Sequence, residues 1–306
     1  MKTLIYKIKN KLFRYSKEAA KLRRPSTEEL MKYKSFQRTR DNKFVLSFGA
    51  GRCGQNWFAK IFNSHTNWIG TCERFSDYEA FYRYISYYNL PIDKEEVFKI
   101  FELASNRDMA NYQNTFIASP YLSFGVKELY KRLNPDHLFF HIRNPVKSVE
   151  SFYRKGWYLN YDSLTIDSPL IDTSESLKRK FSRIVPENDF LNEWLKLTRI
   201  GKLAWFWSTI NKAIFYDLNK LEDIDKSFIR LEDVDQNYEN YEKLIDKFFF
   251  QKKMTKRQFY NVINKAPNIG PNDKYEYKNW NNLEKKEFER IITRIFPFYD
   301  KIKTNI

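Results

Sequence analysis

Residues 44–64 read FVLSFGAGRCGQNWFAKIFNS. The apolar run at 44–48 predicts a buried strand, and the apolar residues after Gly54 recur three and four positions apart, which is typical of a helix. Between them, Gly49, Gly51 and Gly54 permit positive φ angles, so the loop can turn its backbone N–H groups toward an anion. The first turn of the helix adds a partial positive charge at the same point. The stretch therefore predicts a β-loop-α unit that cradles a phosphate group.

The letters inside this loop argue against a nucleoside triphosphatase. Gly49 and Gly54 have the spacing of the G-x-x-x-x-G-K-[ST] loop. Gln55 and Asn56, however, stand where that loop needs a lysine for the phosphates and a hydroxyl for Mg²⁺. A nucleotide kinase with a degenerate loop stays open as an alternative, although it would need a catalytic lysine that the sequence does not offer there.

The same glycines also match the dinucleotide fingerprint G-x-G-x-x-G. Glu73 lies nineteen residues past Gly54, about where that motif places an acid for the ribose. Against this interpretation, Trp57 and Phe58 open the following helix and are too bulky for the close helix–strand contact that the motif serves. A glycine fingerprint alone is also a weak signal.

Residues 52–57, RCGQNW, resemble the 5′-phosphosulfate loop of the sulfotransferases, commonly [KR]-S-G-[TS]-[TS]-W. Three positions match that pattern: Arg52, Gly54 and Trp57. Three depart from it: Cys53, Gln55 and Asn56. The hydroxyls usually found at these positions help to hold the 5′-phosphate, and side-chain amides can donate in their place.

A second motif follows about ninety residues later. Residues 137–142, HLFFHI, form a continuous apolar run of the kind that is buried in a parallel sheet. Arg143 stands at its end, Asn144 is a favourable N-cap, and Pro145 suits the first helical position. Ser151 lies about two helical turns past Asn144 and so on the same helix face. Arg143 and Ser151 are therefore expected to converge on one anion.

This second stretch resembles the 3′-phosphate motif of the same family, R-[DN]-P-x(5)-S, which Arg143, Pro145 and Ser151 match. Residues 268–280 resemble the family's mobile segment that closes over the cosubstrate, with Lys274 and Lys278 expected to reach its phosphates. The resemblance covers about residues 44–300 and implies that 3′-phosphoadenosine 5′-phosphosulfate (PAPS) is the cosubstrate. The residues implied in binding PAPS are Arg52, Cys53, Gly54, Gln55, Asn56, Trp57, Arg143, Ser151, Lys274 and Lys278.

The implied activity is transfer of a sulfuryl group from PAPS to a hydroxyl or amine of an acceptor such as a glycan, a lipid or a small alcohol. Arg52 is the expected catalytic cation, because negative charge grows on the departing 5′-phosphate. Glu73 is the candidate general base, and the alternative is a surface carboxylate paired with Arg74. Three histidines are the rival bases: His65, His137 and His141.

The rest of the chain sets the expected architecture. We expect an α/β protein with three layers, α/β/α, around a central and largely parallel sheet, with ligands at the C-terminal ends of the strands. Residues 119–130 predict a strand that enters a helix, and residues 228–234 predict a late strand. Residues 190–216 predict a helix with Trp194, Trp205 and Trp207 in the core.

Charge is concentrated at the N-terminus. Residues 1–43 hold fourteen Lys and Arg against four Asp and Glu, a net of +10 out of the formal +16. We therefore expect a basic amphipathic leader at 1–43 and a sulfotransferase domain at 44–306, without a nucleic-acid partner. Residues 1–24 carry an apolar helical face amid nine Lys and Arg, a pattern that suits peripheral contact with an anionic membrane.

The chain has two cysteines, Cys53 and Cys72, without a C-x-x-C pair or a histidine at ligand spacing. This pattern predicts neither a disulfide framework nor a metal site. It fits a reducing compartment, so we expect the protein in the cytoplasm, where the basic leader would allow peripheral contact with the inner membrane surface. A non-catalytic module that binds nucleotides or membranes, with a decayed loop, stays open as a further alternative.

Overall fold

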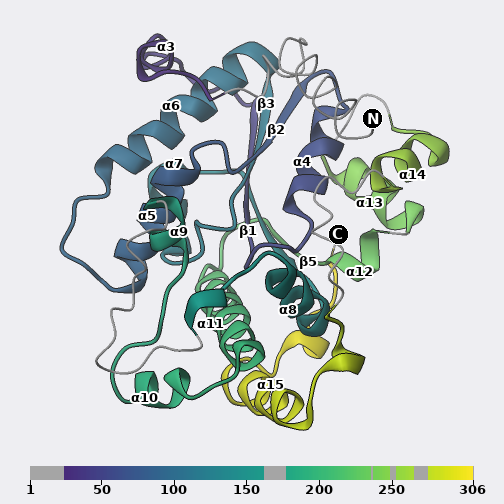
Figure 1. Ribbon diagram of the computed structural model, residues 1–306. Helices are drawn as coiled ribbons and strands as arrows, with labels where there is room; N and C mark the ends of the chain where they lie inside the picture. The colour runs from purple at the N-terminus through teal and green to yellow at the C-terminus, as the bar shows by residue number, and fades with distance from the viewer. Residues whose placement is uncertain (1–23, 162–176, 236, 249–252, 265–274, 306) are drawn as a thin grey trace, which may run out of the picture.

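The computed structural model describes residues 24–161, 177–235, 237–248, 253–264 and 275–305 (Figure 1). The strands are β1 (Lys43–Phe48), β2 (Trp68–Cys72), β3 (Asn114–Ala118), β4 (His137–Ile142) and β5 (Lys226–Arg230). They form one sheet in the order β2-β3-β1-β4-β5, and every strand pair in it is parallel. This confirms the predicted α/β class and the parallel sheet.

Helices surround the sheet. Those that precede or connect the first four strands are α3 (Thr27–Met31), α4 (Gln55–Asn63), α5 (Ser76–Tyr87), α6 (Glu95–Tyr112) and α7 (Val126–Leu133). Between β4 and β5 come α8 (Pro145–Arg154), α9 (Leu177–Ser182), α10 (Asp189–Leu195) and α11 (Arg199–Asn219). After β5 come α12 (Leu231–Val234), α13 (Tyr238–Lys247), α14 (Lys256–Asn264) and α15 (Asn282–Ile295). Short 3₁₀ turns lie at Leu159–Tyr161, Tyr277–Asn279 and Tyr299–Lys301.

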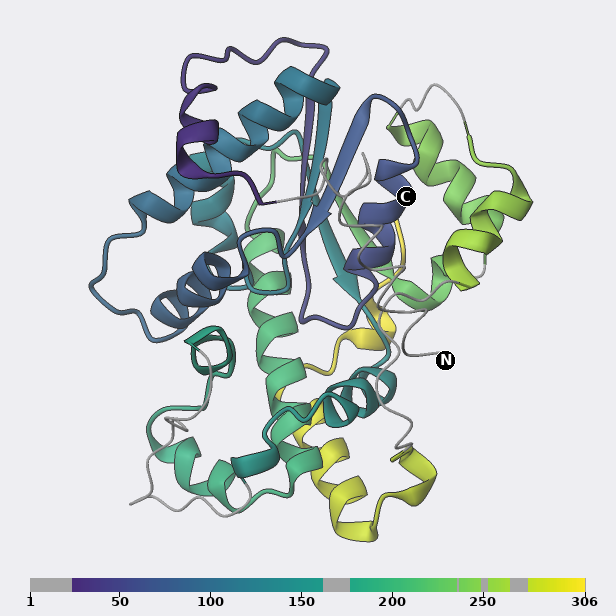
Figure 2. The ribbon, with the colours of Figure 1, turned by 45° about the horizontal axis from the view of Figure 1, so that its top comes forward.

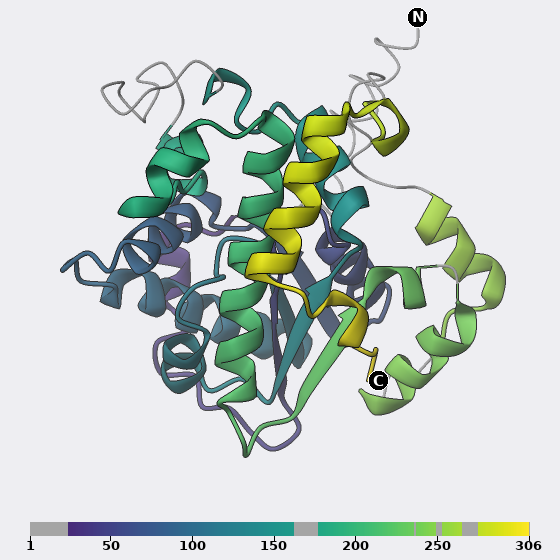
Figure 3. The ribbon, with the colours of Figure 1, turned by 90° about the horizontal axis from the view of Figure 1, so that it is seen from below.

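The central strand β1 shows why three layers form. Phe44, Leu46 and Phe48 point to one face of the sheet and pack in the larger core, whereas Val45 points to the other face and packs with the α4 side chains. Figure 1 shows α5, α6 and α7 over the first face and α4, α13 and α14 over the second. The view in Figure 2 shows α4 and α6 on opposite sides of the strands. Figure 3 shows α15 lying alongside α11.

The strand order places a switch point beside β1. After β1 the chain adds β2 and β3 on one side of it, and later adds β4 and β5 on the other side. In an open parallel sheet, connections that diverge in this way leave a crevice at the C-terminal ends of the strands where they part. The loop after β1 and the loop after β4 therefore meet, and these are the two loops that carry the phosphate motifs.

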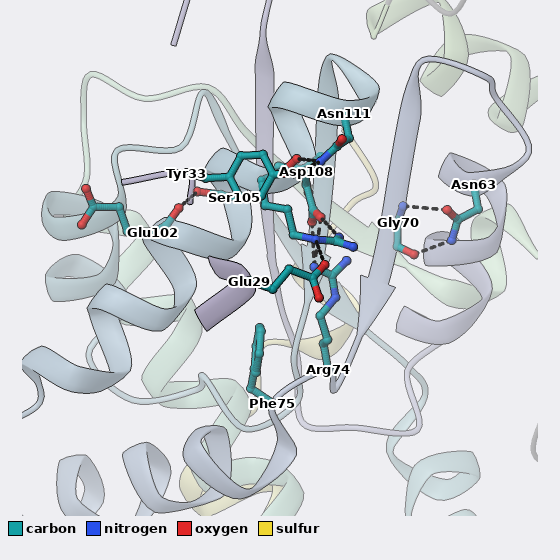
Figure 4. A network of polar contacts seen from close by, with 12 residues as sticks. Glu29, Tyr33, Asn63, Gly70, Arg74, Phe75, Glu102, Ser105, Asp108 and Asn111 are labelled. Carbon is teal, nitrogen blue, oxygen red and sulfur yellow. Dashed lines mark hydrogen bonds and ion pairs between the residues drawn. The ribbon is translucent and has the colours of Figure 1, made fainter. Parts of the chain in front are cut away.

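Both edges of the sheet are capped by side-chain amides. At β2, the Asn63 side chain accepts from the Gly70 N–H at 3.1 Å and donates to the Gly70 carbonyl (Figure 4). At β5, the Asn305 N–H donates to the Phe228 carbonyl at 3.1 Å, and its side chain accepts from the Phe228 N–H. These bonds satisfy backbone groups that an edge strand would leave open. Gly70 is required at its position, because a Cβ there would lie 2.2 Å from the Ala59 carbonyl oxygen of α4.

Two sequence assignments are corrected. Residues 119–125 form a loop; the strand is β3, which ends at Ala118, and the helix α7 begins at Val126. The predicted strand at 228–234 ends at Arg230, and α12 begins at Leu231. By contrast, β4 has the predicted bounds. The three tryptophans expected in the core, Trp194, Trp205 and Trp207, are buried.

The N-terminal region touches the body before β1 begins. Leu30 is buried in the larger core, and Arg38 pairs with Asp136 at the start of β4. Residues 1–23, which carry the predicted amphipathic face, lie outside the described residues, and the division at residue 43 stays a prediction. Among the described helices, none combines the length and the apolar character needed to cross a membrane.

A buried ionic network supports the end of β2 (Figure 4). Arg74 Nη1 donates to both carboxylate oxygens of Asp108, at 2.9 and 3.1 Å, and the two side chains are only 3% and 0% exposed. Arg107 bridges Asp108 and Glu29, and the Thr115 hydroxyl donates to the same Asp108 carboxylate at 3.2 Å. The network ties α6 to β2, β3 and α3.

We expect Asp108→Asn to lower the free energy of unfolding by about 3–5 kcal/mol, because it leaves the Arg74 guanidinium buried without its carboxylate. Urea denaturation followed by circular dichroism measures the change. The matched control is Glu95→Gln, which breaks an exposed ion pair with Arg132 and should cost about 1 kcal/mol or less. Equal losses of unfolding free energy in both variants would show that the buried network stabilises the fold no more than an exposed ion pair does.

Candidate functional site

The loop after β1 has the backbone of an anion cradle. Gly51, Arg52 and Gly54 have φ angles of 88°, 58° and 91°. Gly54 is the N-cap of α4, whose first intrahelical bonds run from the Trp57 and Phe58 N–H groups to the Gly54 carbonyl at 2.8 and 3.0 Å. The N–H groups that precede them in the first turn have no carbonyl partner within the helix, and the helix dipole adds positive potential there.

Two of the predicted ligand side chains turn inward beneath this loop. Cys53 is 3% exposed, and burial raises the pKa of its thiol to about 12. Its Sγ lies 3.7 Å from Gln55 Oε1, and Gln55 Nε2 lies 3.4 Å from the Ser47 carbonyl oxygen. Both side chains are held against β1, and the backbone N–H groups of Gly51, Cys53 and Gln55 lie within hydrogen-bonding reach of the Cys53 sulfur. Asn56 is half-buried beside them.

Trp57 packs rather than lining the loop. It is 8% exposed and makes edge contacts with Phe58 and with Phe259 of α14, at ring-centroid distances of 4.6 and 6.0 Å. Behind the loop, Leu231 of α12 closes on Gly54, where a Cβ would lie 2.6 Å from its Cδ1. A larger residue at Gly54 would therefore shift the Leu231 side chain as well as strain the backbone.

The two motifs meet through direct hydrogen bonds. Arg52 Nε donates to Ser151 Oγ of α8 at 2.8 Å, and Arg143 Nη1 donates to the Arg52 carbonyl oxygen at 3.2 Å. Burial lowers the pKa of Arg52, repulsion from Arg143 lowers it further, and attraction to Glu73 opposes both effects. Two guanidinium groups this close favour an anion between or beside them.

Arg143 and the start of α8 are fixed from the opposite side by α12. The Asn144 side chain caps α8 by accepting from the Lys147 N–H at 3.2 Å, as the sequence predicts. Its own N–H donates to Glu232 at 2.9 Å, and Glu232 also accepts from the Tyr299 hydroxyl at 3.0 Å. Arg143 Nε lies 3.9 Å from the same carboxylate. Glu232 therefore holds the Asn144 backbone and the Tyr299 hydroxyl together beside Arg143.

Glu73 follows β2 directly and has a positive φ of 55°. Its N–H donates to the Ala118 carbonyl at 3.1 Å, which extends the ladder with β3 by one residue. The neighbouring Arg74 forms an ion pair with the buried Asp108. The half-buried Glu73 lies close enough to Arg52 to raise its pKa.

The rival histidines lie elsewhere. His137 and His141 are buried in β4, and burial lowers the pKa of each to about 3, so both are neutral near pH 7. His141 is thus part of the core. His65 follows α4 and is also buried. Among the described residues, no group of three or more His, Cys, Asp and Glu side chains could hold a metal ion.

The C-terminal segment approaches α8. Lys274 lies outside the described residues. Lys278 is exposed, and its Nζ lies 3.2 Å from Glu276 Oε2. The backbone of the segment is held by Glu150, which accepts from the Tyr277 N–H at 2.9 Å on the residue before Ser151.

Sequence reasoning missed the loop at 119–123. This loop faces the loop after β1, residues 49–54, which is called the phosphate loop below. The Ser123 hydroxyl lies 3.4 Å from the Gly49 carbonyl oxygen, and Pro120 Cβ lies 3.3 Å from where a Cβ would stand on Gly51. The loop was hidden by the mistaken strand assignment. Asn114–Ala118, an apolar β-branched and aromatic run before Ser119 and Pro120, was the signal that could have separated strand from loop.

Comparisons with known proteins give structural matches only. No family model matches the sequence, and no curated protein matches it significantly. One matching structure is the sulfotransferase domain from the curacin biosynthetic pathway, at 12% identity and a TM-score of 0.44, over 84% of this chain and 98% of that one. Another is mouse sulfotransferase SULT7A1 complexed with PAP, at 11% identity and a TM-score of 0.37, over 91% and 92% of the two chains. Likeness at this level leaves function to be argued from the site itself.

We expect Arg143→Ala to weaken binding of adenosine 3′,5′-bisphosphate (PAP) by about 1.5–3 kcal/mol, because it removes a charged donor. Ser151→Ala should cost about 0.5–1.5 kcal/mol, the range for a neutral hydrogen bond. Calorimetric titration measures both, and the double variant should be non-additive if the two residues serve one phosphate. Unchanged affinity in Arg143→Ala would mean that this residue only ends the strand.

Proposed function

We propose that this protein transfers a sulfuryl group from PAPS to a hydroxyl or amine of an acceptor. The observation that carries the proposal is the contact between the two motifs: Arg52 Nε bonds Ser151 Oγ at 2.8 Å, across 99 residues of sequence. A strand-end arginine, a helix hydroxyl and a glycine loop at a helix N-terminus meet at one crevice. That set suits a ligand with two separate phosphate groups better than a ligand with one.

The proposed reaction breaks the bond between the sulfuryl sulfur and the 5′-phosphate oxygen and forms a bond from sulfur to the acceptor oxygen or nitrogen. Negative charge grows on the departing phosphate. In this proposal Arg52 and the first turn of α4 stabilise that charge without rearranging, which is electrostatic preorganisation. PAP and the sulfated acceptor are the products.

The acceptor proton is assigned to Glu73 in this proposal. Its carboxyl group follows the C-terminal end of β2, on the side of the sheet crevice opposite to α12. A general base in this position takes the proton as the acceptor attacks, which typically contributes about 10²–10⁴ in rate. The left-handed backbone at Glu73 sets the direction of its side chain, and Arg52 lies within electrostatic reach.

PAP should raise the melting temperature of the protein in a thermal-shift panel. Ligand at about 100 times its Kd adds roughly 2.7 kcal/mol to the native state. ATP with Mg²⁺ and NAD should stabilise much less, because neither has a phosphate on the ribose 3′ position. The Arg143→Ala variant is the matched control and should lose most of the shift. Stabilisation by NAD alone would restore the dinucleotide interpretation and overturn this proposal.

Arg52→Ala should reduce kcat by about 10²–10³, the range seen when one donor to a developing anion is removed. The loss of PAPS affinity should be much smaller, because the charge that Arg52 neutralises grows mainly in the transition state. Arg52→Lys should recover part of the rate, since an ammonium restores the charge but lacks the guanidinium geometry. PAP release from PAPS across a panel of phenols, sugars and amines measures turnover. Near-normal turnover in Arg52→Ala would refute the assigned mechanism.

A further inference from the structure

Helix α5 holds two buried charges one turn apart that the mechanism above does not use. Glu79 is 1% exposed and Arg83 is 0% exposed. Glu79 Oε1 accepts from the Phe75 N–H at 2.9 Å, and Glu79 Oε2 accepts from the Ser119 hydroxyl at 2.5 Å. Each of its oxygens therefore holds a different loop, one after β2 and one after β3.

Arg83 holds the same region with its guanidinium. It donates to Ser123 Oγ at 3.1 Å, to the Ser182 carbonyl at 3.1 Å, and to the Pro120 carbonyl. Its cation also lies 5.0 Å from the centre of the Tyr121 ring. Most of these contacts fall within 119–123, so this one side chain fixes the loop at several points.

The contacts continue from the 119–123 loop to the phosphate loop. The Ser123 hydroxyl, which accepts from Arg83 and donates to the Pro120 carbonyl, lies 3.4 Å from the Gly49 carbonyl oxygen, and Pro120 packs against Gly51. Gly49 and Gly51 have no side chains with which to hold their own positions. The backbone shape of the cradle is therefore supported from outside, by a loop that Arg83 fixes.

A parallel set of contacts reaches the candidate base. Glu79 binds the N–H of Phe75, two residues after Glu73, while the Glu73 N–H is bound by Ala118 next to Ser119. The turn at 73–75 is thus held at both ends. A left-handed residue such as Glu73 keeps its conformation only where the surroundings over-determine it.

Burying the charges of Glu79 and Arg83 costs desolvation free energy. Their hydrogen-bond partners indicate which parts of the structure this arrangement stabilises. Burial lowers the pKa of Arg83 to about 10, although Glu73 and Glu79 oppose that shift. Apolar side chains of similar volume would fill the space without desolvating a charge. They would leave the loop carbonyl, hydroxyl and N–H groups without their partners, and the two loops would lose their fixed positions.

We propose that Glu79 and Arg83 are positioning residues, a buried clamp on α5 that sets the geometry of the phosphate loop and of the Glu73 turn. The role in catalysis rests on the proposed sulfuryl transfer. The structural role, in which the clamp orders residues 49–54, 73–75 and 119–123, is inferred from the contacts alone. The hydrogen bonds described above run to backbone and hydroxyl groups of the loops, so both residues act through those loops.

The experiment compares Arg83→Met with Arg107→Met. Arg107 is a matched control: it is also a buried arginine on the same side of the sheet, and it donates to Glu29 and Asp108, which lie outside the two loops. Hydrogen exchange by mass spectrometry is followed in the ligand-free protein, and PAP affinity is measured by calorimetry. In Arg83→Met, exchange should rise at 49–54 and 119–123 but not at 226–247, and PAP should bind about 2- to 30-fold more weakly. Arg107→Met should change neither quantity.

Each outcome bears on a separate claim. Unchanged exchange in both loops of Arg83→Met would overturn the clamp, whatever the ligand results. Wild-type protein that fails to bind PAP would count against the proposed function, while the exchange comparison would still decide the clamp. If Arg83→Met does not fold, Arg83→Lys replaces it, because it keeps the charge but cannot reach all three oxygen acceptors. Full PAP affinity and wild-type exchange in Arg83→Lys would then refute the need for the guanidinium.

Discussion

The hydrogen bond between Arg52 and Ser151 joins the two halves of the site, and the topology of the sheet makes it possible. Because β1 lies between β3 and β4, the loop after β1 and the helix after β4 open onto the same crevice. Arg143 adds a second guanidinium by bonding the Arg52 carbonyl. Two cations in a partly buried crevice repel each other, so the arrangement is most stable when an anion is present.

The two sides of this crevice are stabilised by different kinds of interaction. Toward α4, the aromatic side chains of Phe58, Phe62, Phe116 and Phe139 pack against one another, so the helix that carries the cradle is held by apolar contact. Toward α5 and α6, buried charges hold the loops: Arg74 with Asp108, and Glu79 with Arg83 beside it. Apolar contact fixes an element in place, whereas directional hydrogen bonds fix the conformation of a loop.

Helix α12 links the site to the end of the chain. Leu231 closes on Gly54, Glu232 holds the Asn144 N–H, and Asp233 accepts from the Thr304 hydroxyl at 2.7 Å. Three consecutive residues thus contact the phosphate loop, the second motif and Thr304, which precedes the Asn305 that caps β5. A displacement of α12 would alter the cradle and Arg143 together, so it couples the two proposed phosphate positions.

The sequence by itself determined the two local units of the site, because their signals are short-range. The glycine loop between β1 and α4, the buried run of β4, the Asn144 cap and Pro145 at the first helical position all follow from neighbouring residues. The tertiary structure alone decided the rest. It turned Gln55 inward, ended β5 at Arg230, placed a loop where a strand was expected, and brought Arg83 to that loop from 37 residues away. These outcomes depend on partners outside the local pattern, eight residues away for Gln55 and 37 for Arg83, and periodicity carries no information about which groups will satisfy a buried amide or charge.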